Sequence, residues 1–104
     1  MSASASPFVI AQSLRVPGLG LLVLPATPVP EWLPIPALYT VLSLQLHRPA
    51  QPPLALLATI EELSSALGPP TRALLLDADP GGKLPIGAWL SLTLTLTLPE
   101  GELV

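Results

Sequence analysis

Cysteine is absent from this chain, histidine occurs once and charged residues are few, so several classes of function are excluded at the outset. Without cysteine there are no disulfides and no thiolate chemistry. One histidine and no cysteine leave only carboxylates as further metal ligands, so no metal site is expected. Charged residues make up 11% of the 104 residues, well below the ~25% of an average globular chain. We therefore expect either low solubility or a partner that covers an apolar patch.

Basic residues are scarce as well, with Arg15, Arg48, Arg72 and Lys83 scattered singly in a chain of net charge −3. Nucleic-acid binding needs clustered lysine or arginine against phosphates, so the composition argues against an RNA partner. Residues 1–7 have neither the basic region nor the apolar run of a signal peptide. No run reaches the roughly 18 apolar residues of a membrane helix. The expectation is a cytoplasmic protein without membrane contact.

Short apolar segments separated by turn signals run along the chain and predict an all-β domain. The first two segments, Phe8–Val16 and Leu21–Leu24, flank Pro17-Gly18. Proline presets φ to about −65° and glycine accepts a positive φ, as a type II turn requires. We therefore predict a β-hairpin here, with a bulge in its first strand near Ala11 and Gln12.

Three later segments also have the alternation or the compactness of strands. From Leu90 to Leu98, leucine alternates with serine or threonine without a break, which is a strong strand signal. Turn regions over 47–53 and 79–82 separate the segments. The later strands are predicted at Leu38–Leu46, Thr71–Ala78 and Ile86–Leu98.

Residues 54–67 are ambiguous. Leucines and an isoleucine are spaced as on one face of a helix, at Leu56, Ile60, Leu63 and Leu67. The glycine and proline that follow would stop a helix. The first five residues are apolar on every side, as in a buried strand. Periodicity cannot separate the two structures in so short an apolar run, so both stay open at this point.

The segment Pro25–Pro36 carries five prolines, which remove backbone donors and exclude a regular strand. We expect a rigid loop that is extended in parts and pinned to the body by Trp32, Leu33 and Ile35. A proline-rich peptide ligand for another protein is the alternative.

Six stretches occur in an order that is typical of one known family. They are Phe8-Val9-Ile10, Val16–Leu24, Tyr39–Leu44, Ile60-Glu61, Ala73–Leu76 and Lys83–Gly87. This succession resembles domain 2 of translation GTPases such as elongation factor Tu, a domain that also occurs as short stand-alone bacterial proteins. The resemblance covers roughly residues 8–92 and implies a six-stranded closed or nearly closed antiparallel β-barrel. We expect this domain to span residues 8–98, between a disordered arm (1–7) and a tail (99–104). The resemblance also favours a strand over 54–61, followed by at most a short helical turn over 62–67.

The chain departs from this family where nucleotide and RNA chemistry would lie. It has no G-x-x-x-x-G-K-[ST] motif, so no nucleotide hydrolysis is implied. Leu19 stands between the two turn glycines, where the family usually has a basic residue. Glu61 matches a glutamate that lies near the tRNA acceptor end in the full factor. Here Glu62 and uncharged residues follow it, where the family has an aromatic and basic stretch.

No arrangement of polar residues indicates catalysis. A Ser-His-Asp set could be written around His47, with Asp77 and either Ser43 or Ser64, but there is no nucleophile elbow. A solvated position in a proline-rich turn is the expectation for His47. Asp77 and Asp79 begin like a calcium loop but lack its final acidic residue.

The three largest aromatic side chains, those of Trp32, Tyr39 and Trp89, are expected in the core or as loop anchors. They are the alternative candidates for partner binding, since aromatic residues dominate interface hot spots.

We therefore predict a non-catalytic binding module without cofactor, metal or small-molecule substrate. Its partner is expected to be a protein, contacted through the loop Pro25–Pro36 and the strand-end rim Glu61–Ser65. A translation-associated RNA or tRNA-end binder is the alternative, and a hydrolase is a distant third. The bias toward leucine, proline and alanine also fits a chain under weak selection. The candidate contact residues are Leu19, Trp32, Leu33, Glu61 and Glu62.

Overall fold

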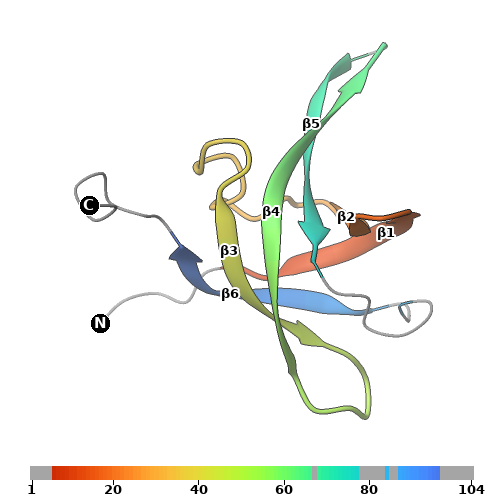
Figure 1. Cartoon of the computed structure of the whole chain (residues 1–104), viewed down its shortest axis with the longest axis vertical. Helices are drawn as coiled ribbons and strands as arrows, with labels where there is room; N and C mark the ends of the chain where they lie inside the picture. Colours follow the sequence, from red (N-terminus) through yellow and green to blue (C-terminus); the bar gives the residue numbers. More distant parts are fainter. Residues whose placement is uncertain (1–5, 67, 78–83, 85–86, 97–104) are drawn as a thin grey trace.

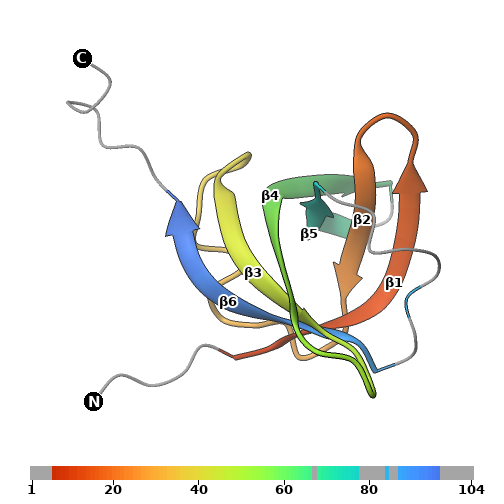
Figure 2. The same ribbon diagram turned by 60° about the horizontal axis from the view of Figure 1, so that its bottom comes forward.

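The computed structural model describes residues 6–66, 68–77, 84 and 87–96, and these residues form six strands and no helix. The strands are β1 (Phe8–Val16), β2 (Gly20–Pro25), β3 (Val41–His47), β4 (Leu54–Ser65), β5 (Gly68–Leu76) and β6 (Trp89–Leu96). All neighbours pair antiparallel in the order β1-β2-β5-β4-β3-β6, and β6 returns to β1 to close a barrel. Figures 1 and 2 show this barrel from two directions. The predicted all-β, six-stranded antiparallel barrel is confirmed. With no helix among the described residues, none of them forms a membrane-spanning helix.

The β1–β2 hairpin forms as predicted around Pro17-Gly18. The backbone N–H of Leu19 donates to the carbonyl of Val16 at 3.0 Å, and Gly18 has φ of 79°. This is the positive φ that a type II turn requires at its third residue. The strand register shifts between Ile10 and Gln12, which confirms the predicted bulge.

β4 resolves the ambiguous segment as a strand. It pairs with β3 from Leu54 to Thr59 and with β5 from Ala58 onward. The strand expected over 54–61 is confirmed and continues to Ser65, so the alternative helix and a helical turn directly after Glu61 are wrong. Leu67 lies outside the described residues. Pairing first with β3 and then with β5 gives the backbone of β4 ladder partners along its length, which outweighs local helix propensity.

Strand boundaries differ from the prediction at several ends. β3 begins at Val41 rather than Leu38, since Tyr39 adopts a positive φ of 69° that breaks the strand. β5 begins three residues before Thr71, where it follows β4 outward in a protruding hairpin (Figure 1). β6 begins at Trp89. The predicted turn 79–82 lies outside the described residues. So do residue 78, at the end of the predicted strand 71–78, and residues 97 and 98, at the end of the predicted strand 86–98.

The register of β6 against β3 also shifts, which strict alternation of leucine did not predict. Leu92 lies opposite Leu44, whereas Leu94 lies opposite Ser43, so Thr93 is an extra residue between them. A bulge of this kind bends a strand and increases its twist, and both help a small sheet to close on itself.

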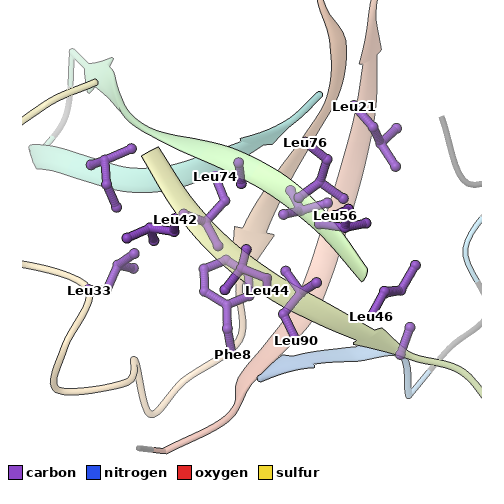
Figure 3. Packing of buried hydrophobic residues seen from close by; sticks show 14 of the residues in the cluster. Phe8, Leu21, Leu33, Leu42, Leu44, Leu46, Leu56, Leu74, Leu76 and Leu90 are labelled. Atoms are coloured by element: carbon purple, nitrogen blue, oxygen red, sulfur yellow. The ribbon is translucent and has the colours of Figure 1, made fainter. Parts of the chain in front are cut away.

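The core fills the barrel with alternate residues of the strands, as the pleat requires. Leu42, Leu44 and Leu46 of β3 are fully buried, and Figure 3 shows them among side chains from the other strands and from the loop after β2. The buried cluster consists of Phe8, Leu21, Val23, Trp32, Leu33, Leu42, Leu44, Leu46, Leu56, Ala58, Ile60, Leu74, Leu76, Ala88 and Leu90.

Candidate protein-binding surface

The loop between β2 and β3 is held against the barrel by two buried side chains. We call residues Pro25–Pro36 the proline loop. Leu33 is 1% exposed and Trp32 is 7% exposed, and the ring of Trp32 packs 6.4 Å from that of Phe8. The predicted pinning by Trp32 and Leu33 is confirmed, but that by Ile35 is wrong, since this side chain is 77% exposed.

The proline loop also binds the segment that precedes β1. The indole Nε1 of Trp32 donates to the carbonyl of Ser6 at 2.7 Å, and the Ser6 hydroxyl donates to Oε1 of Glu31 at 2.6 Å. The Ser6 backbone N–H donates to the other carboxylate oxygen at 3.3 Å. The hydroxyl donor is the main cause that lowers the pKa of Glu31, because it stabilises the carboxylate.

Arg72 connects the proline loop to the rim of the β4–β5 hairpin. It lies opposite Glu62 in the strand register, and its Nη1 donates to the carbonyls of Leu33, at 3.5 Å, and Pro36. A half-buried guanidinium thus holds the loop in place with charge-assisted hydrogen bonds. The two regions that the sequence proposed for partner contact therefore lie together in the fold.

A shallow hollow of about 280 Å³ lies between the proline loop and β5. Its walls include Pro25, Val29 and Pro34 from the loop and Pro70 and Arg72 from β5. Proline rings have little conformational freedom to lose, so such walls are rigid before any partner arrives.

Two large apolar side chains are exposed in the proline loop and shortly after it. Ile35 is 77% exposed and Tyr39 is 68% exposed. Tyr39 is locked in its left-handed conformation because its N–H donates to Ile60 at 2.8 Å, while the N–H of Ile60 donates to Thr40 at 3.1 Å. The expectation that Tyr39 is a core or anchoring residue is therefore wrong. A strained backbone under an exposed aromatic side chain is typical of functional sites.

The two glutamates of the candidate set differ in their surroundings. Glu61 is half-buried and accepts a hydrogen bond from the Thr59 hydroxyl at 2.9 Å, whereas Glu62 is exposed. Both lie on β4, directly after Ile60, whose carbonyl accepts the N–H of Tyr39. Neighbouring residues of a strand point to opposite faces, so Glu62 shares its face with Arg72, whereas Glu61 lies on the face of Thr59.

Leu19 is exposed but lies elsewhere. It occupies the tip of the β1–β2 hairpin, and the proline loop begins at the opposite end of β2 (Figure 2). Arg15, Asp77 and the turn residues around Leu19 line a separate open hollow of about 320 Å³. The structure thus groups Glu62 with the proline loop that Trp32 and Leu33 anchor, and separates Leu19 from them.

His47 does not lie in a solvated turn, as the sequence suggested, but is the half-buried last residue of β3. Its ring stacks on that of Trp89 with centroids 3.9 Å apart, and Nε2 lies 2.8 Å from the Ser91 hydroxyl. The register of β3 against β6 creates this cluster. Trp89 is 37% exposed, so it too lies outside the core.

The other polar residues considered for catalysis do not join His47. Oδ1 of Asp77 instead accepts the backbone N–H of Leu57 at 3.3 Å. Asp79 lies outside the described residues. Within the described ranges, no three histidine or acidic side chains gather as metal ligands would.

Comparisons with family models, curated protein sequences and solved structures found no match to this chain. The resemblance to domain 2 of translation GTPases therefore stays a prediction, and function must be inferred from the surface itself.

Proposed function

We propose that this protein is a non-catalytic binding module that contacts another protein through the proline loop, Tyr39 and the adjoining rim of β4. The observation that carries the proposal is the exposure of Ile35 and Tyr39 on a segment that is otherwise rigidly held. Exposed apolar anchors on a preorganised scaffold lose little entropy on binding, so they are favourable hot-spot residues.

The arrangement of charge supports a protein partner over RNA. Arg15 lies at the end of β1, Arg48 follows β3 and Arg72 lies in β5 with hydrogen bonds to the proline loop. Phosphate binding needs several cations on one face, and the described arginines are spread over separate elements. Glu62, which shares its face of β4 with Arg72, would repel phosphates from the proposed surface.

The cluster around His47 supports the assignment as a non-enzyme. Ser91 and His47 are in hydrogen-bond contact, but no carboxylate within the described part of the chain hydrogen-bonds to the imidazole. A nucleophilic pair of this kind normally needs a third group that orients the base. Kinship to translation-factor domain 2 and a cytoplasmic location belong to the same proposal and rest on the sequence.

The test is affinity capture from the native host with a tagged full chain. The variant Ile35→Ser/Tyr39→Asn removes both anchors, and asparagine suits the positive φ of position 39. The control Leu14→Ser/Leu57→Ser removes two other exposed leucines. We expect a protein that the wild type and the control capture equally, and that the anchor variant captures at least about tenfold less.

Equal capture by both variants would contradict the proposed surface. Loss of the captured material on nuclease treatment would favour the RNA alternative instead. Thermal unfolding of each variant, followed by circular dichroism, shows whether the fold is intact.

A further inference from the structure

The strand that closes the barrel is paired along one edge only in part. β6 pairs with β3 from Trp89 to Leu96, but with β1 only at Trp89 and Leu90. One further hydrogen bond, from the N–H of Ile10 to the carbonyl of Ala88, extends this contact toward the start of β6. Within the described part of the chain, the other edge of β6 therefore has no partner strand from Ser91 onward.

The residues before β1 do not continue beside β6. Pro7 has no N–H to donate, and Ser6 is bound to Glu31 and Trp32 of the proline loop. Residues 6 and 7 are thus directed away from the strand that an extended β1 would pair with.

Other strand edges are also unpaired within the described ranges: those of β1 and β4 carry charged residues, and that of β5 is protected by proline. β2 pairs with β5 only from Leu74 to Leu76, so the outer part of β5 has no β2 partner within the described ranges. Pro69 and Pro70 lie there and remove two backbone donors. Proline on an exposed edge is a common way in which proteins prevent strand addition.

The edge of β6 has no such protection. From Trp89 to Leu98 the sequence contains neither proline nor a charged residue, and leucine alternates with serine or threonine. An uncharged, alternating and unpaired edge is a template for pairing with another strand.

We propose that β6 is a homodimerisation edge, to which a second copy of this chain adds its own β6 in antiparallel orientation over Ser91–Leu96. A two-fold axis through such a pair places the same unpaired N–H and C=O groups of each copy opposite one another. The chain carries a net charge of −3, but the paired segment carries none, so the strands meet without like-charge repulsion. This dimer leaves the proline loop free and is independent of the proposed partner surface.

The test measures the mass of the full chain by sedimentation equilibrium over a wide concentration range. Thr93 is exposed in β6, and Thr93→Lys brings two cations together across the axis. Thr71→Lys is the matched control, an exposed threonine on the protected edge of β5. We expect a wild-type dimer, an unchanged dimer for Thr71→Lys, and dimerisation at least about tenfold weaker for Thr93→Lys.

Amide hydrogen exchange of the wild type tests the same contact without a substitution. Leu92 has the strand parity of Ala88 and Leu90, so its N–H is directed to the open edge. We expect its protection to rise with protein concentration. A monomer at every concentration overturns the proposal. This holds if the Leu92 amide exchanges freely, and equally if it is protected at every concentration by residues 1–5 of the same chain. A dimer that both threonine variants retain equally overturns it as well.

Discussion

At the scale of single residues, Gly20 decides how closely β2 approaches β5. Its φ is 136°, and a Cβ at this position would overlap the carbonyl oxygen of Leu76. Gly18, two residues earlier, also has a positive φ, but a Cβ there would meet open space. The two glycines of one turn are therefore required for different reasons.

We predict that Gly20→Ala lowers the free energy of unfolding by about 2–4 kcal/mol, because backbone strain and a backbone clash are combined. Gly18→Ala should lower it by about 1 kcal/mol, the cost of the left-handed conformation alone. Urea unfolding followed by tryptophan fluorescence measures both. Equal losses for the two variants would show that the close approach to Leu76 is not the cause.

At the scale of elements, the contact between the N-terminal segment and the proline loop depends on a carboxylate. Hydrogen bonds from Ser6 hold the pKa of Glu31 below its ordinary value of 4.5. Because the folded-state pKa is the lower one, this contact stabilises the fold above pH 4.5 and is lost as the pH falls through the folded-state pKa. Protonation of Glu31 weakens the hydrogen bonds that it accepts from Ser6.

We predict that the indole N–H signal of Trp32 in NMR shifts toward its solvent-exposed position on acidification below about pH 4.5. The N–H should then exchange faster, because its acceptor is the carbonyl of Ser6. Glu31→Gln removes the titrating group and should abolish this pH dependence, with Glu62→Gln as the matched control. The same acid transition in Glu31→Gln and in the wild type would contradict the role of Glu31.

At the scale of the whole molecule, the barrel closes through two short seams. β1 meets β6 at Phe8 and Val9, and β2 meets β5 over Leu21–Val23, whereas β3 and β4 pair continuously from Val41 to Leu46. Local opening needs less free energy where fewer ladder hydrogen bonds must break. The barrel is thus expected to open first along its seams.

Native-state hydrogen exchange tests this order of opening. We predict that the amide of Ile10, which donates to Ala88 across the β1–β6 seam, exchanges by an opening of lower free energy than the amides of β3. Exchange of both sets at the global free energy of unfolding would show instead that the seams are as stable as the rest of the barrel.

Much of the fold could be predicted from the sequence, because side chains of a strand alternate between two faces. The apolar alternation at Leu42, Leu44 and Leu46 and the turn at Pro17-Gly18 are local signals that needed no knowledge of neighbours. The proline loop could be predicted as a loop from its missing donors. Of the candidate site, the loop was predicted from its prolines and the rim from the family resemblance, whereas the exposure of Ile35 and Tyr39 was not predicted.

The sequence by itself determined the all-β class, the first hairpin and the irregular segment after it, since each follows from backbone sterics or from the period of the pleat. Only the tertiary structure decided between the helix and the strand that local patterns left open over 54–65, because pairing with two neighbouring strands overrides helix spacing. It also decided that Arg72 joins the proline loop to the rim, that His47 stacks on Trp89, and that β6 keeps an open edge. These contacts join residues far apart in the chain, so no local pattern contains them.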